Sequence, residues 1–253
     1  MSEGLIPGRN PVREALLAGR PVERLLVAKG AGGAPLAEIL RLAAEQGIAV
    51  QEVDRRRLDR MTEGAVHQGV VAVAAPRAYV PLDELLRRAE ERGEPPLLLV
   101  LDEVQDPHNL GSLLRSADGA GAHGVVIPKR RSAGLTMTVA RTSAGAVEHV
   151  PVAQVSNLVQ AIRALKERGL WVVGADMAAE QDLWDADLTG PMAVVIGGED
   201  KGLGRLVRES CDFLVRIPMR GRVNSLNAGV AGALVLFEIA RQRRGGKPRP
   251  GGG

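Results

Sequence analysis

Three short segments carry the residues that could do chemistry, and each follows a short apolar run at its downstream end. They are Asn109–Arg115, Gly197–Gly202 and Ile217–Asn227. Polar side chains placed where buried strands end are how an open α/β sheet builds a ligand cleft. We therefore expect the three segments to meet in one pocket.

The first segment places an arginine on a helix that is predicted to begin at Asn109. Helical side chains lean toward the N-terminus, so Arg115 should point over Gly111 and Ser112, two small residues that leave space. An arginine beside an open helix start is suited to binding a phosphate. The alternative is that Asn109 only caps the helix and Arg115 only pairs with Asp118.

The second segment follows the apolar run 193–196 with two glycines, which let backbone groups approach a ligand closely. Glu199 then projects from the strand end into the presumed cleft. Taken alone, this pattern is also typical of a tight turn. The nearby Gly202–Gly204 lacks the strand–GxGxxG–helix context of a dinucleotide site, so we discount NAD.

The third segment follows the apolar run 213–217 and leads into an Ala-rich helix predicted from Leu226 to about Arg243. Either Ser225 or Asn224 could cap this helix. Its first N–H groups, together with short polar side chains, offer hydrogen bonds to a polar ligand. We expect its apolar face to pack on the sheet or on a second subunit.

Continuous apolar runs that alternate with helical stretches surround these segments. This pattern is typical of a parallel sheet covered on both faces, so the predicted fold class is α/β. The runs are 97–101, 125–127, 171–173, 193–196 and 213–217.

The chain before this sheet reads as a separate small α/β unit over residues 1–77. Helices are predicted at 11–18 and 35–46, and strands at 24–29, 49–53 and 70–74. Residues 78–96 are charged and Pro-rich at their end, with a helix predicted at 82–91. Their composition suits an interdomain linker.

The 253 residues are 45% apolar, which is ample for packed cores. A single cysteine, Cys211, allows neither an internal disulfide nor a cysteine metal cluster, so we expect a reducing compartment and no metal. No run reaches the roughly 18 apolar residues of a membrane span. We therefore expect a cytoplasmic protein without a membrane anchor.

Aromatic residues make up only 2% of the chain, so any nucleic-acid binding must depend on phosphate contacts and not on aromatic stacking. The net charge is +3, and the acid-free residues 241–253 carry five cations, which leaves −2 on the rest. The tail 245–253, expected to be disordered, is either an RNA-binding arm or a solubilising terminus. Shorter basic runs at Arg55–Arg57 and Lys129–Arg131 are each typical of a solvated face.

Taken together and in order, the three segments resemble the motifs of the SpoU (TrmH-like) family of RNA ribose 2′-O-methyltransferases. The likeness covers 97–244 as the catalytic domain. Residues 1–77, with Gly8–Val12 and His67–Ala72, resemble the ribosomal-protein-like substrate-binding domain of many members. Within the family the likeness is greatest to bacterial large-subunit ribosomal RNA guanosine 2′-O-methyltransferases.

The resemblance implies S-adenosylmethionine as methyl donor, a homodimer with the active site near the subunit interface, and a C-terminal trefoil knot. The residues that match the family's catalytic positions are Asn109, Arg115, Glu199, Ser225 and Asn227. Those that match its cofactor-binding positions, largely through backbone, are Gly197, Gly198, Ile217, Met219, Ser225 and Leu226.

The reaction must remove a proton from a ribose hydroxyl, and the family proposal assigns this to the first-motif arginine. A guanidinium has a pKa above about 12 and is essentially never deprotonated in proteins. We therefore expect Arg115 to hold a phosphate, with Ser225, Asn227 or Glu199 assisting proton movement. The rival interpretations are a transfer RNA methyltransferase and a non-catalytic RNA-binding ribosome-assembly factor.

Overall fold

The computed structural model describes residues 4–199, 201–222 and 225–245, and the chain divides into two compact units. The first unit contains residues 1–78 and 134–149, and the second contains 79–133 and 150–253. None of the described helices is both long and apolar enough to cross a membrane. Of the expected tail, 246–253 lie outside the described residues.

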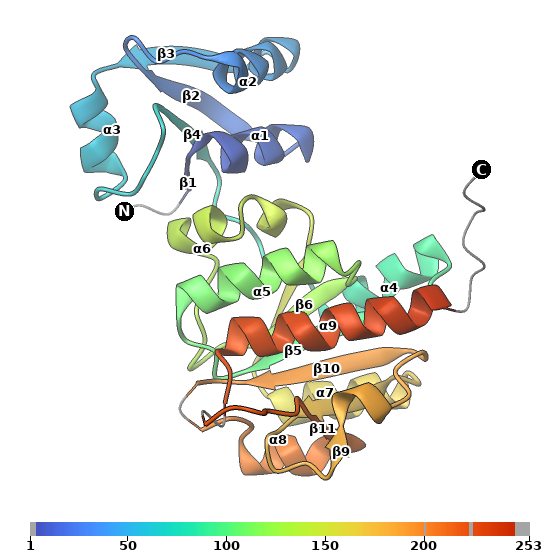
Figure 1. Ribbon diagram of the computed structural model, residues 1–253. Helices are drawn as coiled ribbons and strands as arrows, with labels where there is room; N and C mark the ends of the chain where they lie inside the picture. Colours follow the sequence, from blue (N-terminus) through green and yellow to red (C-terminus); the bar gives the residue numbers. More distant parts are fainter. Residues whose placement is uncertain (1–3, 200, 223–224, 246–253) are drawn as a thin grey trace, which may run out of the picture. The chain divides into compact units, whose positions relative to one another are not determined.

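The first unit is built on a sheet with strand order β1-β4-β2-β3 (Figure 1). Its strands are β1 (Leu5–Pro7), β2 (Val22–Ala28), β3 (Ala49–Val53) and β4 (Val70–Ala74), and its first helices are α1 (Arg9–Leu17), α2 (Ala34–Glu45) and α3 (Arg55–Met61). Side chains alternate along a strand, so Leu25 packs with α1 and α2 on one face. Leu26 packs with Leu58 of α3 on the other. β1 escaped prediction because three residues are too few to show a pattern.

The second chain segment of the first unit contains α6 (Met137–Thr142) and η1 (Ala146–Glu148). The Glu148 side chain is only 1% exposed and accepts hydrogen bonds from Arg20 Nη1 at 2.6 Å and Arg77 Nη1 at 2.7 Å. Gly145, at φ +96°, lies so close to Glu14 that a Cβ would sit 2.5 Å from its side chain. The sequence analysis placed this segment in the catalytic domain, because no local sequence pattern indicates that Glu148 pairs with Arg20 and Arg77.

The second unit is built on a sheet with strand order β7-β6-β5-β10-β8-β11-β9, and every neighbouring pair is parallel. This confirms the predicted fold class. The strands are β5 (Leu97–Asp102), β6 (Gly124–Pro128), β7 (Val152–Val155), β8 (Trp171–Ala175), β9 (Gln181–Asp182), β10 (Met192–Gly197) and β11 (Phe213–Arg216). The short strands β7 and β9 were not predicted.

Helices cover both faces of this sheet. α4 (Leu82–Arg92), α7 (Leu158–Glu167) and α8 (Arg205–Ser210) contribute to one buried cluster with β5, β6 and β10. α5 (Pro107–Gly119) and α9 (Ala228–Gly245) lie side by side (Figure 1). A Cβ on Gly232 of α9 would meet Leu113 of α5 at 2.3 Å, so glycine permits this close packing.

The segment expected to be a linker, 78–96, instead belongs to the second unit through α4. Leu85 is fully buried, and a Cβ on Gly124 of β6 would lie 2.4 Å from its Cδ2. The charged composition of α4 hid an apolar stripe that packs on the sheet.

Two helix starts in the second unit differ from the prediction. α5 begins at Pro107 and not at Asn109, because Asp106 Oδ1 accepts from the His108 N–H at 2.9 Å and proline suits a first helical position. α9 begins at Ala228, with Asn227 Oδ1 accepting from the Gly229 N–H at 2.9 Å. Asn227 therefore replaces Ser225 as the cap; Asn224 lies outside the described residues.

Candidate functional site

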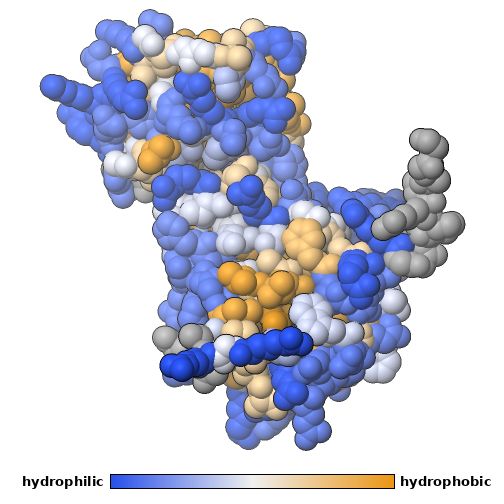
Figure 2. Space-filling model, in the orientation of Figure 1, coloured by the Kyte–Doolittle hydropathy of each residue, from blue (hydrophilic) through white to orange (hydrophobic). Residues whose placement is uncertain are grey.

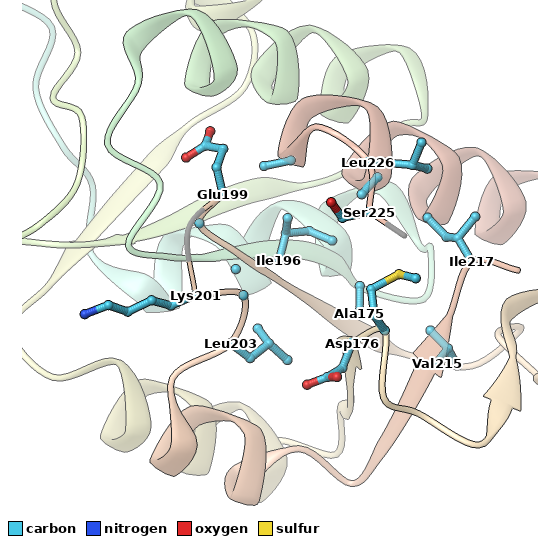
Figure 3. Close-up of a pocket in the computed structure, with 16 residues that line it drawn as sticks. Ala175, Asp176, Ile196, Glu199, Lys201, Leu203, Val215, Ile217, Ser225 and Leu226 are labelled. Carbon is cyan, nitrogen blue, oxygen red and sulfur yellow. The ribbon is translucent and has the colours of Figure 1, made fainter. Parts of the chain in front are cut away.

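A cavity of about 290 Å³ lies at the carboxyl ends of β8, β10 and β11, close to the roughly 300 Å³ at which ligand pockets begin. In Figure 3 the side chains of Ile196, Ile217 and Leu226 face it from three segments, whereas Lys201 extends away. Its lining is Ala175, Asp176, Met177, Ile196, Gly197, Gly198, Glu199, Lys201, Gly202, Leu203, Val215, Ile217, Ser225, Leu226, Ala228 and Ala231.

The turn after β10 forms one wall of the cavity from backbone. The Gly202 N–H donates to the Gly198 carbonyl at 3.0 Å, which folds the turn back on itself. A Cβ on Gly197 would lie 2.1 Å from the Gly202 carbonyl carbon, and one on Gly198 would lie 2.5 Å from the Glu103 oxygen. Both positions require glycine, so at Gly197 and Gly198 the wall presents peptide groups to the cavity and no side chains.

Asp102, at the end of β5, fixes the far end of the same turn. It is 7% exposed, and its Oδ2 accepts from the Gly204 N–H at 2.7 Å. Burial raises the pKa of this carboxyl above its ordinary value, and the Gly204 N–H opposes the shift. The sequence analysis did not single out Asp102, although an acid ending an otherwise apolar strand was the available signal.

A chain of hydrogen bonds connects one residue from each of the three predicted segments. Asn227 Nδ2 donates to Asn109 Oδ1 at 2.9 Å, and Asn109 Nδ2 donates to Glu199 Oε1. Asn227 is itself oriented by the backbone N–H groups of Gly229 and Val230. All the bonds run in one direction, from the start of α9 toward the carboxylate.

This chain stabilises the position of Glu199 without using all of its acceptors. Asn109 is 7% exposed, whereas Glu199 is exposed and lines the cavity. One carboxylate oxygen receives the Asn109 amide, and the other has no bond to the described part of the chain. The arrangement can therefore present a carboxylate oxygen to a hydroxyl at the edge of the cavity.

The structure brings together most, but not all, of the residues singled out from the sequence. Gly197, Gly198, Ile217, Ser225 and Leu226 line the cavity, as does Glu199, and Asn109 and Asn227 adjoin Glu199. Met219 and Arg115 do not line it.

Arg115 is on the exposed side of α5, opposite the buried leucines of that helix. Within the described ranges it makes no hydrogen bond or ion pair, so the predicted alternative of an Asp118 partner is not observed. Its guanidinium is available to an external anion.

The end of β8 contributes cavity residues that the sequence analysis missed. Asp176 accepts from the Ala178 N–H at 2.8 Å and pairs with Arg208 Nε at 3.2 Å, so its carboxylate is already satisfied. Met177 lies next to it and is 44% exposed. Their only sequence signal was their place at the end of an apolar run. Among the described residues there is no group of three or more histidine, cysteine or acidic side chains that could hold a metal.

Comparison with known proteins assigns this arrangement to a family. The family model described as SpoU rRNA Methylase matches residues 96–237, and that described as RNA 2′-O ribose methyltransferase substrate binding matches 5–80. The chain belongs to the SpoU family. The SpoU match contains all three segments that surround the cavity.

Individual SpoU relatives match nearly the whole chain. YacO of Bacillus subtilis (strain 168), whose name places it among TrmH family tRNA/rRNA methyltransferases, is 51% identical over 93% of this chain and 94% of its own length. The SpoU methyltransferase AviRb from Streptomyces viridochromogenes, in complex with the cofactor AdoMet, superposes with a TM-score of 0.80 at 30% identity over 96% of this chain and 91% of AviRb.

A second cofactor complex gives a similar result. The AdoMet-bound rRNA methyltransferase from Sinorhizobium meliloti has a TM-score of 0.76 at 28% identity, covering 94% of this chain and 86% of that one. The SpoU protein described here is thus an S-adenosylmethionine-dependent RNA methyltransferase. This confirms the family, the enzyme class and the cofactor inferred from the motifs.

Proposed function

We propose that this SpoU enzyme methylates the ribose 2′-hydroxyl of a guanosine in large-subunit ribosomal RNA, and that it does so in the cytoplasm as a homodimer. The observation that carries the proposal is the bond chain Asn227–Asn109–Glu199, which ends beside the cavity. Three segments far apart in sequence supply one oriented carboxylate next to one ligand-sized space.

The cavity suits a cofactor with a flat base, a sugar and a cationic centre. The backbone of the Gly197–Gly202 turn offers hydrogen bonds to polar edges, while Ile196, Ile217 and Leu226 offer apolar walls. We assign the cofactor to these residues and to Ser225. When bound, S-adenosylmethionine supplies an electrophilic methyl group on a sulfonium.

The chain's own residues would handle the hydroxyl and its proton. The unbonded oxygen of Glu199 is the proton acceptor that the geometry favours, with Asn109 fixing the carboxylate and Ser225 offering a second hydrogen bond. Because Arg115 is exposed, carries no partner within the described residues and does not line the cavity, we assign it to phosphate binding.

The proposed homodimer uses an apolar stripe on α9. Val230, Leu234 and Phe237 recur at helical spacing and are 48%, 37% and 50% exposed. Figure 2 shows apolar side chains gathered on this face of the second unit. One patch that serves both subunits is what a two-fold dimer requires. The trefoil knot implied by the family stays a prediction.

The choice of ribosomal over transfer RNA is supported by the SpoU rRNA description of the family model and by the rRNA methyltransferase among the similar structures. The name of YacO includes both substrates. Transfer RNA therefore remains the second candidate substrate, and it is distinguished by assaying the two RNA classes separately.

The experiment is methyl transfer from labelled S-adenosylmethionine to separated ribosomal and transfer RNA, followed by identification of the modified nucleoside. We expect 2′-O-methylguanosine in large-subunit RNA with the wild-type chain, formed about 100-fold more slowly with Glu199→Gln. Label in transfer RNA alone would select the second candidate. No binding of S-adenosylmethionine by isothermal titration, together with no transfer to any RNA, including ribosome-assembly intermediates, would instead indicate a non-catalytic assembly factor.

A further inference from the structure

Four exposed cations lie at the carboxyl edge of the second unit's sheet and have no side-chain partner among the residues that the structure describes. Lys129 and Arg130 directly follow β6, and Arg220 and Arg222 follow β11. None of the four makes a side-chain hydrogen bond or ion pair with the described part of the chain. Arg131, which follows Arg130, does have a partner: its Nη1 lies 2.6 Å from Glu103 Oε1.

Acids at the same edge are largely engaged. Glu103 pairs with Arg131, Asp176 pairs with Arg208, and Asp102 is buried against the Gly204 N–H. Unpaired cations beside satisfied acids leave a surface that attracts polyanions. The Lys129–Arg131 run, which from sequence alone is typical of a solvated face, therefore has a place in a larger pattern.

Strand order places these cations on both sides of the candidate reaction centre. The order is β6-β5-β10-β8-β11, Asn109 follows β5, and Glu199 follows β10. Neighbouring strands are about 4.8 Å apart, so the ends of β6 and β11, which these cations follow, are each roughly 10 Å from β10 along the edge, in opposite directions. A nucleic-acid strand that crosses this edge would present one phosphate group to each side of the target ribose.

The composition of the chain makes such contacts necessary. With aromatic residues at 2% of the chain, base stacking can supply little affinity, and phosphate neutralisation has to supply most of it. Phosphate contacts also fix the register of the strand without reading its bases.

We infer that Lys129 and Arg130 on one side, and Arg220 and Arg222 on the other, bind the phosphates that flank the target ribose and so align the RNA strand across the carboxyl edge. This inference rests on the proposed function, since it takes the Glu199 region as the reaction centre. It names the track of the RNA backbone and not the identity of the nucleotide.

The test compares two double variants, Lys129→Gln with Arg130→Gln and Arg220→Gln with Arg222→Gln, with wild type. Arg163→Gln is the matched control, because Arg163 is exposed on α7 and has no partner among the described residues. The probe is a labelled single-stranded RNA of mixed sequence, titrated at several salt concentrations with S-adenosylmethionine present.

Log affinity falls as log salt concentration rises, and each single-strand phosphate contact contributes about 0.7 to the steepness of this fall. Each double variant loses two contacts, so its slope should be shallower than that of wild type by about 1.4. If the counterion effect vanishes at 1 M salt, each double variant should bind RNA about 25-fold more weakly than wild type at 0.1 M salt. The control and the affinity for S-adenosylmethionine should not change. If a double variant no longer binds the cofactor, its two single variants replace it, each with half the slope change.

A wild-type slope in both double variants, or an equal loss in the Arg163→Gln control, would overturn the inference. The proposed function fails by a different result, namely RNA binding by wild type without methyl transfer to any RNA. The two failures are therefore distinguishable, because the salt slope needs no turnover.

Discussion

Replacing Asn109 by alanine should slow methyl transfer without weakening cofactor binding. The substitution removes the amide that donates to Glu199 Oε1 and the carbonyl that accepts from Asn227 at 2.9 Å. Asn109 is 7% exposed and is not part of the cavity lining, so the space for the cofactor is unaltered. Asn109 is thus a positioning residue that acts through Glu199.

The magnitude follows from the kind of bond that is lost. A hydrogen bond to a charged group contributes about 1.5–3 kcal/mol, and the exposure of Glu199 favours the lower value. About 1.5 kcal/mol corresponds to roughly a tenfold fall in the rate of transfer. Glu199→Gln, which removes the proton acceptor itself, should cost about 100-fold.

The assay is single-turnover transfer of labelled methyl to RNA by wild type, the two single variants and the double variant. Because Asn109 works through Glu199, the double variant should be about as slow as Glu199→Gln alone, at about 100-fold. Asn109→Asp keeps an acceptor for Asn227 but places a second carboxylate beside Glu199, so it should be no better than alanine. Multiplicative losses near 1,000-fold would refute the reasoning.

Three further outcomes are expected. Glu148→Gln removes the charge of a carboxylate that is 1% exposed and lies between two arginines. It should reduce the free energy of unfolding, measured in urea, by about 3 kcal/mol. An unchanged unfolding midpoint would show that the segment 134–149 is held in the first unit by other contacts. Burial raises the pKa of Asp102 in the folded state above its ordinary value, so its contribution to stability is present below the unfolded-state pKa and is lost as the pH rises through the folded-state pKa. Asp102→Asn keeps an acceptor for Gly204 and should flatten this pH dependence in thermal melts; an identical pH profile in the variant would contradict the assignment. Phe237→Glu places a charge on the apolar stripe of α9, and a two-fold dimer would contain this charge twice in its interface. Light scattering should therefore detect a folded monomer. A dimer that persists would show that the interface lies on another surface.

Much of the sheet and of the cavity's backbone was predictable from local signals. The apolar runs predicted five of the strands in the second unit's sheet, and the runs of glycine and polar residues at their ends predicted where the ligand site would form. Such signals depend only on neighbours along the chain, namely residue size, apolar periodicity and backbone freedom.

Pairings between distant segments were decided by the tertiary structure alone. The Asn227–Asn109–Glu199 chain exists because β5 and β10 are adjacent in the sheet, and the Gly204 contact of Asp102 depends on the same adjacency. Likewise, Glu148 lies in the first unit, where Arg20 and Arg77 pair with it, although it is far from both along the chain. Residue type and spacing therefore determined which side chains were available for the chemistry. Strand order decided which of them meet, because the free energy of such contacts depends on positions in space that no local pattern along the chain encodes.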